Sequence, residues 1–139
     1  MAVDDATPII IGVGDFKDKT PDLEKAEDPS ALMYKAIKLA FDDTGLSQQA
    51  QKAHLIAAID GISCVPPWTW NYADLPGVLA GHIGIEKPAY THISDHGGNQ
   101  PGYQLDTAAR RVSQGQSKVV IVTGGEALHT GSFVLNVSC

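Results

Sequence analysis

Short apolar runs alternate along the chain with stretches in which apolar residues recur at helical spacing. Residues 8–13 (PIIIGV) form a nearly continuous β-branched run, which is typical of a strand buried on both faces of a parallel sheet. Three further runs of strand length lie at residues 61–65, 89–94 and 118–123. Strands that alternate with helices of ten or more residues predict βαβ units with right-handed crossovers and a mainly parallel sheet.

Residues typical of helix ends lie at both ends of the stretches with helical spacing. Asp28, followed by Pro29, fits an N-cap with proline at the first helical position, and Gly45 fits the end of the same helix. Further helices are predicted at residues 47–55 (short and weaker), 75–83 and 101–113. Residues 132–137 (SFVLNV) predict one more strand at an edge of the sheet.

Function is expected where the parallel strands end, because ligands of such sheets bind beyond the carboxyl ends of the strands. The turn before residue 101 joins a strand to a helix, so it offers unpaired N–H groups and a positive dipole end. Such a turn suits an anion, a thiolate or a developing oxyanion. It contains no Cys, and its only hydroxyl is on Ser94. Four segments are expected to meet at this rim: residues 14–15, 68–72, 95–99 and 124–127.

Size and charge restrict the possible functions. The 139 residues fit a single domain, with residues 129–139 as an atypical end. The formal net charge is −6, and the only adjacent basic pair is Arg110 and Arg111, which argues against nucleic acid or an anionic membrane as the main partner. No apolar run approaches the roughly 20 residues of a membrane span, and the acidic N-terminus does not resemble a signal peptide.

The two cysteines do not form a disulfide framework. Cys64 lies inside an apolar strand-like run, which predicts a buried, unreactive thiol in preference to a nucleophile. Cys139 is the last residue, so the chain carries neither an SKL-type peroxisomal signal nor a prenylation motif. We expect an intracellular protein, cytoplasmic or peroxisomal, with reduced thiols.

Several polar and aromatic residues near the rim have more than one interpretation. His96 can act as a base beside the turn or be a surface histidine. His92 and His96 lack a third ligand, so no metal site and no cofactor are expected. Glu126 is expected to hydrogen-bond local backbone. The aromatic residues Trp68, Trp70 and Tyr72 can cover a ligand or form a dimer contact.

The segment from Gly12 to Gly14 also suggests a dinucleotide-binding loop after a buried strand. The third glycine of that motif is absent, because Lys17 stands in its place, and no helix begins at once. A nucleotide-binding α/β domain therefore remains an alternative.

Several motifs in order resemble the thiolase superfamily: TPIIIGVG, DPSALMYKAIKLAFDDTG, IDGISCV, YADLPGVLAGHIGI, GGNQP and VVIVTGGEAL. The chain looks most like thiolase-like acetyl-CoA acetyltransferases related to the sterol-carrier-protein thiolases, over nearly all residues up to about Leu128. Family members contain two similar halves, and this chain resembles the N-terminal half. The resemblance implies an α/β fold with a mainly parallel mixed sheet of four to five strands and helices on both faces.

The resemblance also implies acyl transfer on acyl-CoA thioesters in lipid metabolism, by a homo-oligomer or together with a C-terminal thiolase half. Gly98 stands where the family carries its nucleophilic cysteine, so this chain departs from the catalytic pattern, and the family's catalytic His and second Cys belong to the other half. The alternative is a non-catalytic acyl-CoA-binding or assembly module. The expected substrate-binding residues are His96, Gly97, Gly98, Asn99, Gly124 and Gly125.

Overall fold

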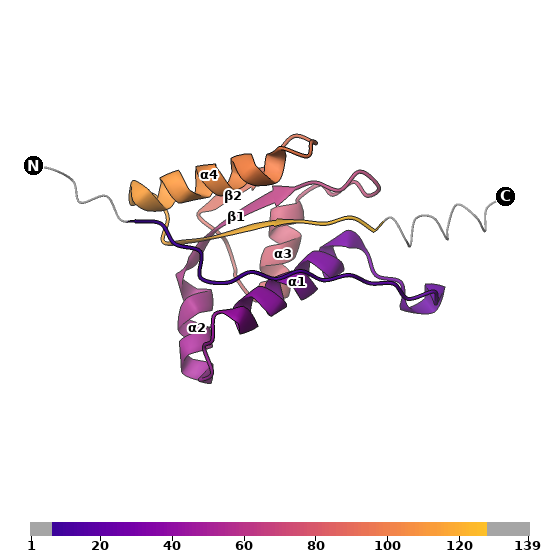
Figure 1. Ribbon diagram of the computed structural model, residues 1–139, viewed down its shortest axis with the longest axis horizontal. Helices are drawn as coiled ribbons and strands as arrows, with labels where there is room; N and C mark the ends of the chain where they lie inside the picture. Colours follow the sequence, from indigo (N-terminus) through magenta and orange to yellow (C-terminus); the bar gives the residue numbers. More distant parts are fainter. Residues whose placement is uncertain (1–6, 128–139) are drawn as a thin grey trace, which may run out of the picture.

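The computed structural model of the protein describes residues 7–127 (Figure 1). This part of the chain contains four α-helices and three strands, and from α2 onward helices and strands alternate, as the pattern of apolar residues predicts. In order, the elements are the 3-10 helix η1 (Leu23–Lys25), α1 (Pro29–Asp43), α2 (Gln49–Ala58), β1 (Ile59–Val65), α3 (Leu75–Ile83), β2 (Tyr90–Ile93), α4 (Gln100–Ser113) and β3 (Val119–Gly124). Among the described residues, no helix has the length and apolar character needed to cross a membrane.

The three strands form a parallel sheet in the order β2-β1-β3. Gly61 of β1 is in register with Tyr90 of β2 and with Val120 of β3. Helix α4 covers one face of the sheet, and α1 and α3 pack together on the other (Figure 1). The parallel strands and the helices on both faces are therefore confirmed.

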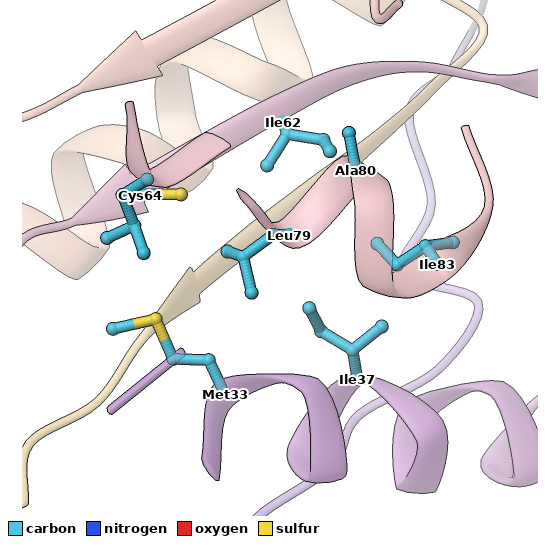
Figure 2. Packing of buried hydrophobic residues seen from close by; sticks show 8 residues of the cluster. Met33, Ile37, Ile62, Cys64, Leu79, Ala80 and Ile83 are labelled. Carbon is cyan, nitrogen blue, oxygen red and sulfur yellow. The ribbon is translucent and has the colours of Figure 1, made fainter. Parts of the chain in front are cut away.

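Alternate residues of β1 serve the two faces, since successive side chains of a strand point to opposite sides. Ile62 and Cys64 are fully buried in the core cluster formed with α1 and α3 (Figure 2). In that cluster Met33 and Ile37 of α1 meet side chains of α3, among them Leu79. An apolar core on this side holds both helices against the sheet.

The opposite face of β1 carries a buried polar contact with α4. The hydroxyl of Ser63 donates to Oε1 of Gln104 at 2.6 Å, and both residues are buried. A satisfied hydrogen bond in an apolar interface fixes how two elements sit against each other, because any shift leaves its polar atoms without partners. This contact sets the position of α4, and with it the turn that precedes α4.

The predicted helix ends at Asp28 and Gly45 are confirmed, and Gly84 ends α3. The Asp28 side chain accepts a hydrogen bond from the Ala31 N–H (2.9 Å), with Pro29 at the first helical position. Gly45 and Gly84 have φ of 75° and 91°, the left-handed conformation that glycine adopts without a steric cost.

The predicted strand at residues 8–13 is wrong, and within residues 7–127 the sheet has three strands instead of four to five. Strands β1 and β3 pair directly, and residues 8–13 run in extended form against α1 instead. A Cβ on Gly12 or Gly14 would come within 2.1 Å of the carbonyl oxygens of Ala40 and Ala36, respectively. The two glycines therefore serve close packing on α1, which accounts for them without a dinucleotide loop. The predicted edge strand at residues 132–137 lies outside the described residues.

Candidate functional site

The turn between β2 and α4 lies at the carboxyl edge of the sheet. The Ser94 N–H still donates to the Cys64 carbonyl of β1 (2.9 Å), so the sheet holds the turn where it begins. Asn99 occupies the N-cap of α4, but its side chain makes no capping hydrogen bond, and Pro101 contributes no N–H to the first turn. The helix N-terminus is therefore left without a side-chain cap, and Gly98 and Asn99 are exposed there.

Gly97 and Gly98 of this turn differ in whether the backbone would tolerate a side chain. Gly97 has φ of 154°, which L side chains rarely adopt, and a Cβ there would lie 2.8 Å from Oδ1 of Asn99. Gly98 has an ordinary φ, and a Cβ added to it would meet nothing within 4 Å. The backbone therefore demands glycine at position 97 but would accept a side chain at position 98.

The aromatic loop after β1 closes over the same turn. The Trp68 and His96 rings are in contact, with centroids 4.0 Å apart and their planes tilted by 31°, and Nε2 of His96 lies 3.3 Å from the Pro67 carbonyl oxygen. Trp68 is still 75% exposed. The structure thus brings the predicted residue His96 together with the aromatic loop, and the outer face of Trp68 stays free for a ligand or a partner.

Glu126 ties the aromatic loop to the end of β3. Its carboxylate accepts hydrogen bonds from the Trp68 N–H, the Thr69 hydroxyl and its neighbour's N–H at Ala127. Partial burial alone would raise the pKa of Glu126, but these hydrogen bonds outweigh it and hold the pKa below its usual value. The prediction that Glu126 binds local backbone is confirmed, with an added link to the loop across the rim.

A second polar contact anchors the far end of the aromatic loop. The Tyr72 hydroxyl donates to Oδ2 of Asp28 (3.0 Å) and accepts from the Ser30 N–H (3.1 Å) at the start of α1. Burial would raise the pKa of Asp28, but hydrogen bonds from the Ala31 N–H, Tyr72 and Ser30 hold it below its usual value. The loop is therefore fixed to α1, to the α4 turn and to β3.

A cavity adjoins one side of this rim. It has a volume of about 330 Å³ and an apolar floor formed by Leu32, Met33 and Ala36 of α1. Its walls are residues 14–20 and 124–127, so the predicted meeting of the segments at Gly14 and Gly124 is confirmed. Gly97, Gly98 and Asn99 do not line it. The predicted residues Gly124 and Gly125 thus belong to a different part of the rim from the α4 turn.

Cys64 is not positioned to act as a nucleophile. Its side chain is fully buried, and burial, with a smaller contribution from the charge of Asp74, raises the pKa of the thiol to about 12. A thiol with this pKa is almost wholly protonated at neutral pH, and the thiolate is the reactive form. The prediction that Cys64 is buried is confirmed.

Sequence reasoning missed the contacts that join distant segments at the rim. Thr69 and Gln104 carry no local signal of their roles, because their partners Glu126 and Ser63 are 57 and 41 positions away. The link from Tyr72 to Asp28 spans 44 positions. The sequence singled out Asp28, Tyr72 and Glu126, but it did not indicate the distant residues that they contact.

Comparison with known proteins identifies similar folds but no close relative. No family model matches the chain, and no curated protein matches it. Among solved structures, a monomeric SCP2-thiolase-like protein from Mycobacterium smegmatis is similar over 85% of this chain, at 24% identity and a TM-score of 0.65. OleA from Xanthomonas campestris (16% identity, 75% of this chain, TM-score 0.58) and an Ltp2–ChsH2(DUF35) aldolase (22%, 81%, 0.56) are also similar.

The chain spans only a fraction of the length of these proteins. It covers 23% of the SCP2-thiolase-like chain, 29% of the OleA chain and 26% of the aldolase chain. The alternation of helices and parallel strands, the open turn before α4 and these similarities agree: the chain has a thiolase-like fold and corresponds to about a quarter of the length of those proteins.

Proposed function

We propose that this chain is a thiolase-like acyltransferase domain that binds acyl-CoA thioesters at the rim and lacks the nucleophile for covalent acyl transfer. The observation that carries the proposal is the α4 turn. An uncapped helix N-terminus opens at the carboxyl edge of the sheet, and Gly98 leaves open space where the resemblance puts the nucleophilic cysteine.

Physical chemistry supports binding at this turn. Exposed N–H groups at the helix start can donate to the carbonyl oxygen of a thioester, and the dipole of α4 favours the negative charge that gathers on that oxygen. Gly97 and Gly98 let a ligand approach the backbone closely, because no side chain covers it. The adjoining rings of Trp68 and His96 form an aromatic surface beside the turn on which an acyl group can pack.

The same residues argue against turnover by this chain alone. Acyl transfer through a covalent intermediate needs a thiolate, a base that activates it and donors for the oxyanion. Gly98 supplies no sulfur, and Cys64 is buried with a raised thiol pKa. Of these three requirements, the α4 turn can therefore supply only the hydrogen-bond donors for the oxyanion, which are its backbone N–H groups.

Titration of the purified chain with acetyl-CoA and with acetoacetyl-CoA tests this proposal. Trp68 lies beside the turn, so its fluorescence is expected to change saturably, and Trp68→Phe removes most of that change while calorimetry still detects binding. We expect no thiolysis of acetoacetyl-CoA. Absence of binding to either thioester would contradict the proposal, and so would turnover that disappears in Cys64→Ser.

A non-catalytic assembly module is the second candidate, favoured by the exposure of Trp68 (75%) and Trp70 (44%). Exposed aromatic residues are enriched at protein–protein interfaces. In that case the chain would form a homodimer or bind a second thiolase half through the aromatic loop. Sedimentation of wild type and of Trp68→Ser distinguishes the candidates, because a dimer that this change dissociates supports assembly and a monomer in both does not.

A further inference from the structure

Trp68 is an exposed aromatic residue at the rim, in contact with His96 of the α4 turn. Its exposure is 75%, whereas aromatic side chains usually bury most of their surface in a folded protein. An aromatic face that stays in contact with water forfeits the stabilisation that burial would provide. Aromatic residues are also enriched at surfaces that bind other molecules. The exposed indole is therefore a candidate recognition surface.

The backbone that carries Trp68 is held by three contacts to three different elements. The Glu126 carboxylate, after β3, accepts hydrogen bonds from the Trp68 N–H and the Thr69 hydroxyl. The His96 ring, before α4, lies against the indole, and the Tyr72 hydroxyl bonds the start of α1. A shift of the loop would break at least one of these contacts. The indole is thus preorganised, and a ligand that binds it does not have to order the loop first.

We propose that Trp68 selects planar, conjugated acyl groups, of which benzoyl is the simplest, and that Glu126 is the positioning residue that holds Trp68 in place for them. This inference rests on the proposed binding of acyl-CoA thioesters at the α4 turn. His96, which contacts the indole, is two positions before Gly98. The indole therefore lies beside the N–H groups that would receive the thioester oxygen.

The chemistry of the indole favours an aromatic ring over a saturated one. Two aromatic rings in an offset-stacked or edge-to-face arrangement gain stabilisation beyond the burial of their area, because their quadrupoles attract. A cyclohexane ring has no π system and lacks this gain. In a benzoyl thioester the ring is conjugated with the carbonyl group, so both lie in one stiff plane and little torsional freedom is lost on binding. Both effects act in the same direction.

The size of this surface favours a small ligand over a protein partner. A stable interface between two proteins buries about 800 Å² on each partner. One aromatic side chain contributes roughly 150–250 Å² when it is covered. Trp68 and Trp70 are the two large apolar side chains exposed between residues 66 and 72. Their area is well below that of a stable interface, whereas the ring of one acyl group needs a single indole face.

Calorimetric titration of the full chain with benzoyl-CoA and with cyclohexanecarbonyl-CoA tests the selection, because these thioesters differ only in the saturation of the ring. We expect benzoyl-CoA to bind about 3- to 10-fold more tightly. A merely hydrophobic surface would bind the saturated ring at least as well, since that ring is the more hydrophobic of the two.

The outcomes separate this inference from the proposed function. Equal affinities, or a preference for the saturated ring, would overturn the selection by Trp68 and leave acyl-CoA binding intact. Absence of binding by both thioesters and by acetyl-CoA would contradict the proposed function and this inference with it.

Two variants of the loop identify the residue that carries the preference. Trp68→Leu keeps an apolar side chain without a π system, so the ratio of the two dissociation constants should fall to about 1. Trp70→Leu is the matched control, because Trp70 is exposed on the same loop but makes no hydrogen bond or ring contact within residues 7–127. A ratio that survives Trp68→Leu, or that is lost equally in Trp70→Leu, would overturn the assignment.

The positioning role of Glu126 is tested through its partner Thr69. Thr69→Val removes the hydroxyl that donates to Glu126 and keeps the shape of the side chain, whereas Thr69→Ser retains the hydroxyl. We expect the ratio to fall toward 1 in Thr69→Val and in Glu126→Ala, and to stay near that of wild type in Thr69→Ser. Hydrogen exchange of the β1 amides verifies that each variant is folded. A merely structural role would weaken both thioesters equally, so an unchanged ratio in Thr69→Val and Glu126→Ala would refute the positioning role.

Discussion

Replacement of Gly14 by alanine tests how the N-terminal segment packs on α1. A Cβ at this position would lie 2.1 Å from the Ala36 carbonyl oxygen and 2.6 Å from the Ala40 nitrogen. Both atoms belong to the backbone of α1, so relief of the overlap requires the helix or the segment to move. The φ of Gly14 is outside the positive region, which means that the cost arises from packing alone.

The expected loss of stability follows from these distances. Overpacking typically costs about 1–3 kcal/mol, and backbone overlap at 2.1 Å belongs at the upper end of that range. The reduced freedom of the unfolded chain offsets roughly 0.4–1 kcal/mol. We therefore expect Gly14→Ala to lower the free energy of unfolding by about 2 kcal/mol and the Tm by roughly 8 °C.

Urea and thermal unfolding followed by circular dichroism measure this loss. Gly98→Ala is the matched control, because a Cβ at Gly98 meets nothing within 4 Å, and its stability should stay within about 0.5 kcal/mol of wild type. If Gly14→Ala were as stable as Gly98→Ala, the segment would not pack against α1 as described.

Three further variants test the contacts around the rim. The folded-state pKa of Asp28 is lowered, so the ionised carboxylate stabilises the fold above its unfolded pKa of about 3.9, and this stabilisation is lost as pH falls. Between pH 6 and pH 3, the Tm of Asp28→Asn should therefore fall less than the Tm of wild type. Tyr72→Phe should lower the free energy of unfolding by about 1 kcal/mol in urea titrations, through loss of its hydrogen bonds. Glu126→Ala should free the loop at Trp68, seen as faster exchange of that amide, while exchange in β1 stays unchanged.

Local signals predicted most of the fold correctly. The helix ends at Asp28 and Gly45 depend on neighbouring residues, and the alternation of strands and helices follows from the local spacing of apolar residues, so both could be found in the sequence. The error at residues 8–13 arose because a β-branched run is compatible with a central strand. Whether it enters the sheet depends on Gly12 and Gly14 meeting a helix more than 20 positions away.

The candidate site was predictable in position but not in detail. The rule that ligands bind at the carboxyl edge of a parallel sheet correctly brought the turn at Gly98 near the loop at Trp68. The contact of Trp68 with His96 and the hydrogen bonds from Trp68 and Thr69 to Glu126 depend on tertiary distances that no local pattern contains.

The most direct test of the proposed site places a thiol in the α4 turn. In Gly98→Cys, attack of the thiolate on acetyl-CoA would form a new thioester at Cβ–S and release CoA as its thiolate, and the helix N-terminus should favour the reactive anion. Intact-mass spectrometry is expected to detect one acetyl group on this variant well before any on Gln114→Cys, at the opposite end of α4. Acetylation of Gly98→Cys no faster than that of Gln114→Cys would contradict the assignment of this turn as the acyl-thioester site.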